Sequence, residues 1–301
     1  MPERGHHTRL DAALATPPPL EDAAHPRALR VRNTLPLRVE ARRQALRRRT
    51  QLTFALLLVL PWLLQLAFVI GGNAGSDAPA LVELATSGAA NFAFFLVFAS
   101  SGFLLGVVVA LFCGDTVASE ASWSSLKYLL AGPPVPRARL LVRKLAVALA
   151  SCVLAVVVLV ASGFVAGGVA FGWHAFVTPL AGTLSTGQSL FRLGVVVVYV
   201  LTSQLFVASL AFLLGVWTDA PLGAVGGAVV LVVVLDILDA VTALGNWREI
   251  SPRHYTTAWI DALGDSLVWS GMAKGALVTL AWTAGLLALA FWHFTRKDVV
   301  S

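Results

Sequence analysis

Two aspartates interrupt one of the most apolar stretches of this 301-residue chain, the run from Ala228 to Val241. Asp236 and Asp239 are three residues apart, so on a helix their side chains share one face. Carboxylates in apolar surroundings are costly, and they suggest a role such as lining a polar path, binding an ion or pairing with a cation. The next basic residues are Arg248 and Arg253, and either could pair with either aspartate. The four residues are therefore candidates for a polar path or for buried charge pairs.

The composition indicates which kind of protein must position these groups. The chain is 57% hydrophobic and 13% charged, about half the charged fraction of soluble domains, and such values are typical of a polytopic membrane protein. The net charge of +6 lies beside apolar runs, which favours anionic lipid headgroups over nucleic acid as its partner. Cys113 and Cys152 have apolar neighbours, so we expect two packed thiols and no disulfide or metal site.

Six stretches are long and apolar enough to cross a bilayer as helices, which takes about 20 residues each. Basic residues cluster on one side of them: 18 fall in residues 1–49, in 114–144 and at the C-terminus, and four fall on the other side. Because positive charge stays in the cytoplasm, both termini are predicted to be cytoplasmic. We therefore predict an all-α, multi-pass protein of the plasma (inner, cytoplasmic) membrane with six transmembrane helices. Their approximate ranges are 51–71, 89–113, 145–171, 190–216, 221–243 and 271–294.

The segments outside the spans differ in character. Residues 1–33 are predicted to be a disordered cytoplasmic tail, and 298–301 a short cytoplasmic tail after the six-helix domain of 51–297. Residues 34–50 have the pattern of a basic amphipathic helix on the inner leaflet; a plain topology signal is an equal alternative. Residues 245–270, with three tryptophans, are predicted to be an external interfacial segment.

The depth of the two aspartates leaves two interpretations open. Counting from Leu222, Asp236 lies about 21 Å across a hydrocarbon core of about 30 Å. The acids then either serve a polar path within the outer third of the membrane, or the fifth span ends early and both reach the outer headgroups. The sequence slightly favours the second interpretation.

The charged segment 114–144 separates the second and third spans. A helix from about Thr116 to Leu130 would align Glu120, Ser124 and Lys127 on one face, and the prolines that follow would end it. Residue physics alone favours a solvated loop with a topology role over an element that transmits force.

A resemblance to a known family changes this balance. The order of residues between the second and third spans resembles that in the membrane subunits of ABC-2 type exporters. That family carries an acidic pair, Gly/Ser-Thr-Leu-Lys, Pro-Val-Ser-Arg and then Leu and Lys, whereas this chain has Ser124-Ser125 for Gly-Thr and Pro136 for Ser. The matching residues are Gly114-Asp115, Glu120, Ser125-Leu126-Lys127-Tyr128-Leu129-Leu130, Pro134-Val135-Pro136-Arg137, Leu140-Leu141 and Lys144.

The resemblance implies that segment 114–144 holds a coupling helix that docks on a separate ATPase subunit. It also implies re-entrant helices between the fifth and sixth spans that form an outer gate. Family members dimerise through their first and fifth spans, which makes Gly223 and Gly227 candidates for a contact in a homodimer. The residues implied in ATPase coupling are Asp115, Glu120, Ser124, Lys127, Tyr128, Pro134, Arg137 and Lys144.

The chain has no G-x-x-x-x-G-K-[ST] phosphate loop, so it is not expected to be an enzyme, and ATP with Mg²⁺ would be bound by the partner ATPase. The predicted function is the permease of an exporter for an amphiphilic cargo, such as a drug (multidrug efflux), an antibiotic, a lipid or a secondary metabolite. The main alternative is a stand-alone channel or ion-coupled secondary transporter that uses Asp236 and Asp239. A membrane-embedded enzyme ranks third, because no H-E-x-x-H or Ser/Lys constellation is present.

Overall fold

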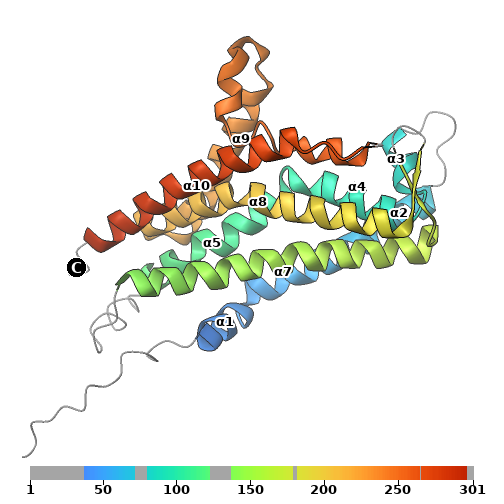
Figure 1. The fold of residues 1–301 in the computed structure, drawn as a ribbon. Coiled ribbons are helices and arrows are strands. Elements are labelled where there is room, and N and C mark those ends of the chain that lie inside the picture. Colours follow the sequence, from blue (N-terminus) through green and yellow to red (C-terminus); the bar gives the residue numbers. More distant parts are fainter. Residues whose placement is uncertain (1–36, 72–79, 123–136, 179–181, 265, 297–301) are drawn as a thin grey trace, which may run out of the picture. The chain divides into compact units, whose positions relative to one another are not determined.

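The computed structural model describes residues 37–71, 80–122, 137–178, 182–264 and 266–296 (Figure 1). The predicted disordered tail 1–33 and the coupling residues Ser124, Lys127, Tyr128 and Pro134 lie outside these residues. Helices make up nearly all of the described chain. Its elements are α1 (Leu37–Ala45), α2 (Arg48–Gly71), α3 (Ala80–Ala85), α4 (Ala89–Ser101), α5 (Leu104–Ser122), α7 (Arg137–Phe171), β1 (Phe176–Val177), β2 (Thr183–Leu184), α8 (Thr186–Thr218), α9 (Pro221–Ala240), the 3-10 helices η4 (Thr242–Ile250) and η5 (Ala258–Leu263), and α10 (Ser270–Arg296).

Five of these helices are long and apolar enough to cross a membrane, namely α2, α7, α8, α9 and α10, and the bent pair of α4 and α5 forms a sixth candidate span. The structure is therefore mostly helical, with one two-stranded pair, and its five or six long apolar helices are compatible with the predicted multi-span membrane protein. Figure 1 shows α1 and the C-terminal end of α10 at one end of the helices, and α3 with the two strands at the opposite end. We call these the α1 end and the α3 end.

The second span is not the single helix that the sequence predicted over 89–113. It breaks after Ser101 with a bend of 61° between α4 and α5, and α5 then continues past Cys113 to Ser122. Ser101 and Gly102 form a Gly/Ser pair, a common place for a helix kink, and their carbonyls accept hydrogen bonds from side chains of other elements. Partners of this kind satisfy the backbone groups that a helix break frees within a membrane protein.

Helix α8 forms the centre of the described fold. In its most apolar stretch 67% of the residues are buried, against 11% in α2 and 17% in α9. Helices α2 and α9 therefore present most of their apolar surface to lipid or to another chain. Small residues bring α8 close to α5: a Cβ on Gly215 would lie 2.4 Å from the carbonyl oxygen of Gly114, so the two helices can cross here only with glycine.

The two cysteines lie where α5 meets α7. Both are buried and free, and their Sγ atoms are 4.0 Å apart. The expectation of two packed thiols is confirmed.

Candidate functional site

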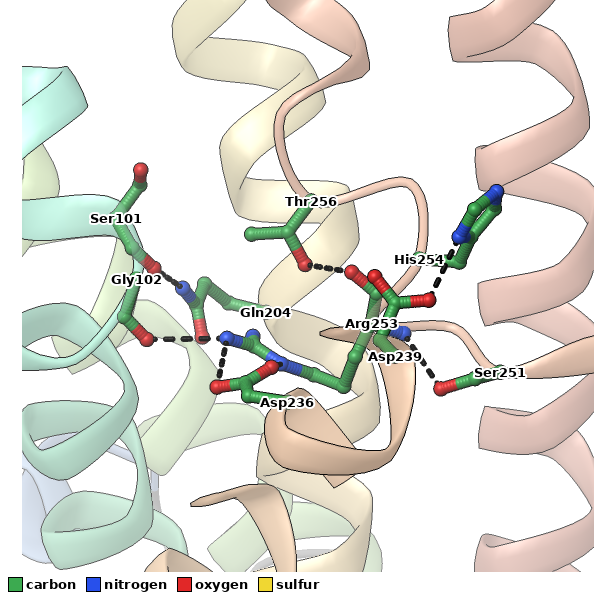
Figure 2. A network of polar contacts seen from close by, with 9 residues as sticks. All are labelled: Ser101, Gly102, Gln204, Asp236, Asp239, Ser251, Arg253, His254 and Thr256. Carbon is green, nitrogen blue, oxygen red and sulfur yellow. Dashed lines mark hydrogen bonds and ion pairs between the residues drawn. The ribbon is translucent and has the colours of Figure 1, made fainter. Parts of the chain in front are cut away.

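The side chain of Arg253, which lies in the segment after α9, contacts two other parts of the fold (Figure 2). Its Nε and Nη2 atoms donate to the two carboxylate oxygens of Asp236 on α9, at 2.6 and 2.9 Å. Nη2 also donates to the carbonyl oxygen of Gly102 at the break between α4 and α5, at 3.1 Å. The arginine side chain is 4% exposed. A bidentate pair fixes the orientation of a guanidinium group, so Arg253 locks the segment after α9 onto the broken second span.

The second acid, Asp239, has a different partner. Its carboxylate lies 2.7 Å from Nδ1 of His254, whereas Arg248 donates only to its backbone carbonyl, at 3.0 Å. Of the pairings that the sequence left open, the structure contains Arg253 with Asp236. His254 was not considered as a partner, although its place directly after Arg253 could have suggested it. Two consecutive residues of one loop reach two acids that share a face of α9.

Gln204 was also missed, although it lies in the predicted fourth span. Its Nε2 donates to the carbonyl oxygen of Ser101 at 3.0 Å, beside Arg253 (Figure 2). The residue is 3% exposed, and its Oε1 has no hydrogen-bond partner within the described part of the chain. A lone amide in an apolar run was the signal that could have found it. We call Gln204, Asp236, Asp239, Arg253 and His254 the Arg253 cluster.

The acids of this cluster lie near the end of α9. The helix ends at Ala240, three residues before the predicted end of the fifth span. Its 20 residues extend about 30 Å, the thickness of a hydrocarbon core. If α9 crosses the whole core, Asp239 lies at the membrane boundary and Asp236 about 4.5 Å deeper, so both interpretations of the sequence stay predictions.

The segment 242–264 is tied to its neighbours by further hydrogen bonds. The hydroxyl of Tyr199 on α8 donates to the carbonyl of Tyr255 at 2.6 Å. The indole of Trp282 on α10 donates to the carbonyl of Ile250 at 2.9 Å, and the guanidinium of Arg192 donates to the carbonyls of Ala262 and Gly264. Each contact satisfies a backbone carbonyl of a segment with little regular structure.

The same segment packs part of its own surface into the fold. Trp259 of η5 is 1% exposed and meets Phe98 of α4 edge to face. Partial burial, followed by the charge of Glu249, raises the pKa of the Tyr255 phenol above its ordinary value, so this phenol stays neutral well above pH 7. The segment predicted to be re-entrant thus contains two short 3-10 helices that are anchored to α4, α8, α9 and α10; its position in a membrane stays a prediction.

A second group of charges lies at the α1 end. The carboxylate of Asp115 on α5 contacts the guanidinium groups of Arg47 and Arg49, and Nζ of Lys144 on α7 lies 2.9 Å from the carboxylate of Glu40 on α1. Asp115 is 3% and Lys144 1% exposed. We call these five residues the α1-end cluster. Two residues that the family resemblance implied in ATPase coupling therefore pack against the N-terminal helices, and their side chains are not on an open docking surface.

The other predicted site residues are spread more widely. Glu120 lies in the last turn of α5 and Arg137 begins α7, but their side chains lie outside the described residues. On α9, a Cβ added to Gly223 would meet only Ala220 and Thr218 of the preceding turn, whereas one on Gly227 would lie 3.3 Å from Leu214 of α8. Gly223 is thus the more open of the two, and their role in a dimer contact stays a prediction. Among the described residues no three His, Cys, Asp or Glu side chains could hold a metal ion together.

The five or six long apolar helices are of the kind expected in a multi-pass membrane protein. Residues 56–300 match a family whose description is "Protein of unknown function (DUF2705)", and the chain belongs to this family. No curated protein matches the sequence.

Proposed function

We propose that this protein is the permease subunit of an ATP-driven exporter of the ABC-2 type, which moves an amphiphilic cargo outward with a separate ATPase subunit. The observation that carries the proposal is the α1-end cluster. It fixes both ends of segment 114–144, the segment whose residues resemble the coupling region of that family. At the start of the segment, Asp115 pairs with Arg49 of α2 and with Arg47, which precedes α2. At its end, Lys144 pairs with Glu40 of α1.

Buried ion pairs make this arrangement suitable for transmitting movement. Asp115 and Lys144 are buried, and a buried group that loses a partner costs about 1–3 kcal/mol, so the pairs resist separation when the segment between them is displaced. A partner that pushes on the segment would therefore move α1, α2, α5 and α7 together.

Helix α5 extends this connection along the molecule. It runs without a break from Leu104, beside the bend, to Ser122, and Asp115 lies about 17 Å from its start. The bend itself is held by Arg253 and Gln204. A displacement of α5 would therefore act directly on the Arg253 cluster and on the segment 242–264. Packed helices change between discrete arrangements, so a small displacement can rearrange the contacts at the bend.

The test is capture of the ATPase. The tagged full chain is purified from native membranes after mild cross-linking, and the bound proteins are identified by mass spectrometry. We expect a phosphate-loop ATPase in stoichiometric amount. It should be lost in Lys127→Ala and retained in the control Lys274→Ala, because Lys274 is one of the four basic residues predicted to lie on the side opposite the ATPase. Transport that persists without ATP, in a protein that captures no ATPase, would contradict the proposal.

The alternative of an ion-coupled transporter that uses Asp236 and Asp239 has less support. Both oxygens of Asp236 are occupied by Arg253, and Asp239 contacts His254. The chain's own side chains thus occupy these carboxylates, and an ion would have to displace them.

A further inference from the structure

An apolar groove of about 500 Å³ lies between α8, α9, η4 and α10. Pockets of about 300–1,000 Å³ hold small ligands in proteins. Six of its apolar lining residues come from the two outer helices: Leu231, Val234, Leu235 and Leu238 of α9, and Trp282 and Leu286 of α10. We call it the α9 groove.

The groove changes character along its length. Its lining positions nearest the α1 end are Leu210, Leu231 and Leu286, all aliphatic. The opposite end is formed by Asp239 with Trp247 and Arg248 of η4. Along α9, Leu231 and Leu238 are about 10 Å apart. The groove is therefore an apolar channel with a charged and aromatic mouth.

Arg248 is the cation of this mouth, and it is held in a fixed position. Its Nη1 donates to the carbonyl of Asp239 and its Nε to the carbonyl of Gly245, at 3.0 and 3.4 Å. No carboxylate of the described residues lies within ion-pair distance of its guanidinium group, although Glu249 follows it in sequence; the nearby carboxylate of Asp239 contacts His254. The guanidinium group keeps Nη2 for an external anion, and an arginine is well suited to bind a phosphate group.

A second groove provides the comparison. It has about 610 Å³ between α8 and α10, and it is lined by residues such as Leu190, Val198 and Met272 with no charged side chain. An acyl chain alone would fit either groove. Only the α9 groove combines an apolar channel with a fixed cation and with tryptophans, which favour the headgroup level of a membrane.

We propose that the α9 groove binds an anionic phospholipid of the surrounding membrane, with one acyl chain along α9 and the phosphate group on Arg248. If α9 crosses the whole hydrocarbon core, its end at Ala240 leaves η4 at the membrane boundary, where such headgroups lie. The proposal holds whether or not an ATPase binds the chain, because it depends only on the contacts of the α9 groove.

The test measures lipid retention on the purified full chain by native mass spectrometry. Phosphatidylglycerol and phosphatidylcholine with identical acyl chains compete for the protein. We expect the wild-type chain to prefer phosphatidylglycerol about fivefold, the effect of one basic residue near an anionic headgroup. The preference should disappear in Arg248→Gln and return in Arg248→Lys. It should remain in Lys274→Gln, which removes an exposed cation that does not line the α9 groove.

A second measurement locates the acyl chain and tests other occupants. Phosphatidylglycerol with a photoreactive acyl chain should cross-link to peptides that contain Leu231–Leu238 and Trp282–Leu286, and the filling variant Leu238→Trp should reduce this cross-linking. Cross-links that map instead to the uncharged groove, or a preference for phosphatidylglycerol that survives Arg248→Gln, would overturn the proposal. So would a Leu238→Trp protein that loses its dimer but retains lipid as before, since a second copy of the chain would then occupy the groove.

Discussion

The two charged clusters hold the helices together by different means. In the α1-end cluster, side chains of α5 and α7 pair with side chains of the N-terminal helices and the short turn between them. In the Arg253 cluster, one arginine donates to a carboxylate of α9 and also to a backbone carbonyl of the broken second span. The first cluster connects whole helices to one another, whereas the second satisfies the backbone groups that are freed by a break in a helix. Its contacts depend on each other, and the loss of one leaves two groups unsatisfied.

The largest effect is expected from Asp236→Ala. This change leaves the guanidinium group of Arg253, 4% exposed, without its counter-ion. Removal of one partner of a buried pair costs about 3–5 kcal/mol. Because the Asp236 side chain is 42% exposed, water can replace part of the interaction, and we expect the lower value, about 3 kcal/mol. The measurement is the free energy of unfolding in detergent micelles.

Two variants control this prediction. Asp261→Ala removes an exposed acid of η5 and should leave the free energy of unfolding within about 0.5 kcal/mol of the wild-type value. The double variant Asp236→Ala with Arg253→Met should be more stable than Asp236→Ala alone, because no buried charge is left unpaired. A double variant that is less stable than Asp236→Ala and than the single variant Arg253→Met would show that Arg253 acts mainly through Gly102.

A smaller loss is expected from Glu40→Ala in the α1-end cluster. Lys144 loses an ion pair of 2.9 Å but has other contacts, so the expected cost is about 1–3 kcal/mol, that of a buried group that loses one partner. Unfolding of the purified protein measures it. If Glu40→Ala destabilises the protein more than Asp236→Ala does, the distinction drawn between the two clusters is wrong.

How far the sequence predicts this molecule depends on the range of the interactions involved. The apolar runs predicted the long helices to within a few residues at most ends, because length and hydropathy are local properties. The acids Asp236 and Asp239 were found for the same reason, since charges stand out in an apolar run. The break at Ser101 was missed although Ser101-Gly102 is a local kink signal, and the side chains that satisfy it, Gln204 and Arg253, lie more than 100 positions away.

The α1-end cluster shows the same limit. The resemblance selected Asp115 and Lys144 by their order in a motif, but their partners Arg47, Arg49 and Glu40 belong to a different helix pair. The sequence described those basic residues only as a surface helix or a topology signal. To predict pairs between distant helices, one must know which helices pack together. The periodicity of a single helix does not contain this information.

The smallest change in stability is expected from Gln204→Leu. This variant separates two functions of the Arg253 cluster, the ion pair with Asp236 and the hydrogen bonds to the break at Ser101 and Gly102. Leucine removes the hydrogen bond to Ser101, worth about 1 kcal/mol net, but it also removes the Oε1 atom that has no partner in the described chain. These terms oppose each other, so the free energy of unfolding should change by about 1 kcal/mol or less. The freed carbonyl of Ser101 should nevertheless loosen the break, and amide hydrogen exchange should rise from Gly102 to Gly106 while α5 beyond Val109 stays protected.

Gln204→Glu serves as the matched control, because it keeps an acceptor near Arg253 but cannot donate to Ser101 when ionised. Unchanged exchange in Gln204→Leu would show that Arg253 alone holds the break, and the amide of Gln204 would then be a packing residue.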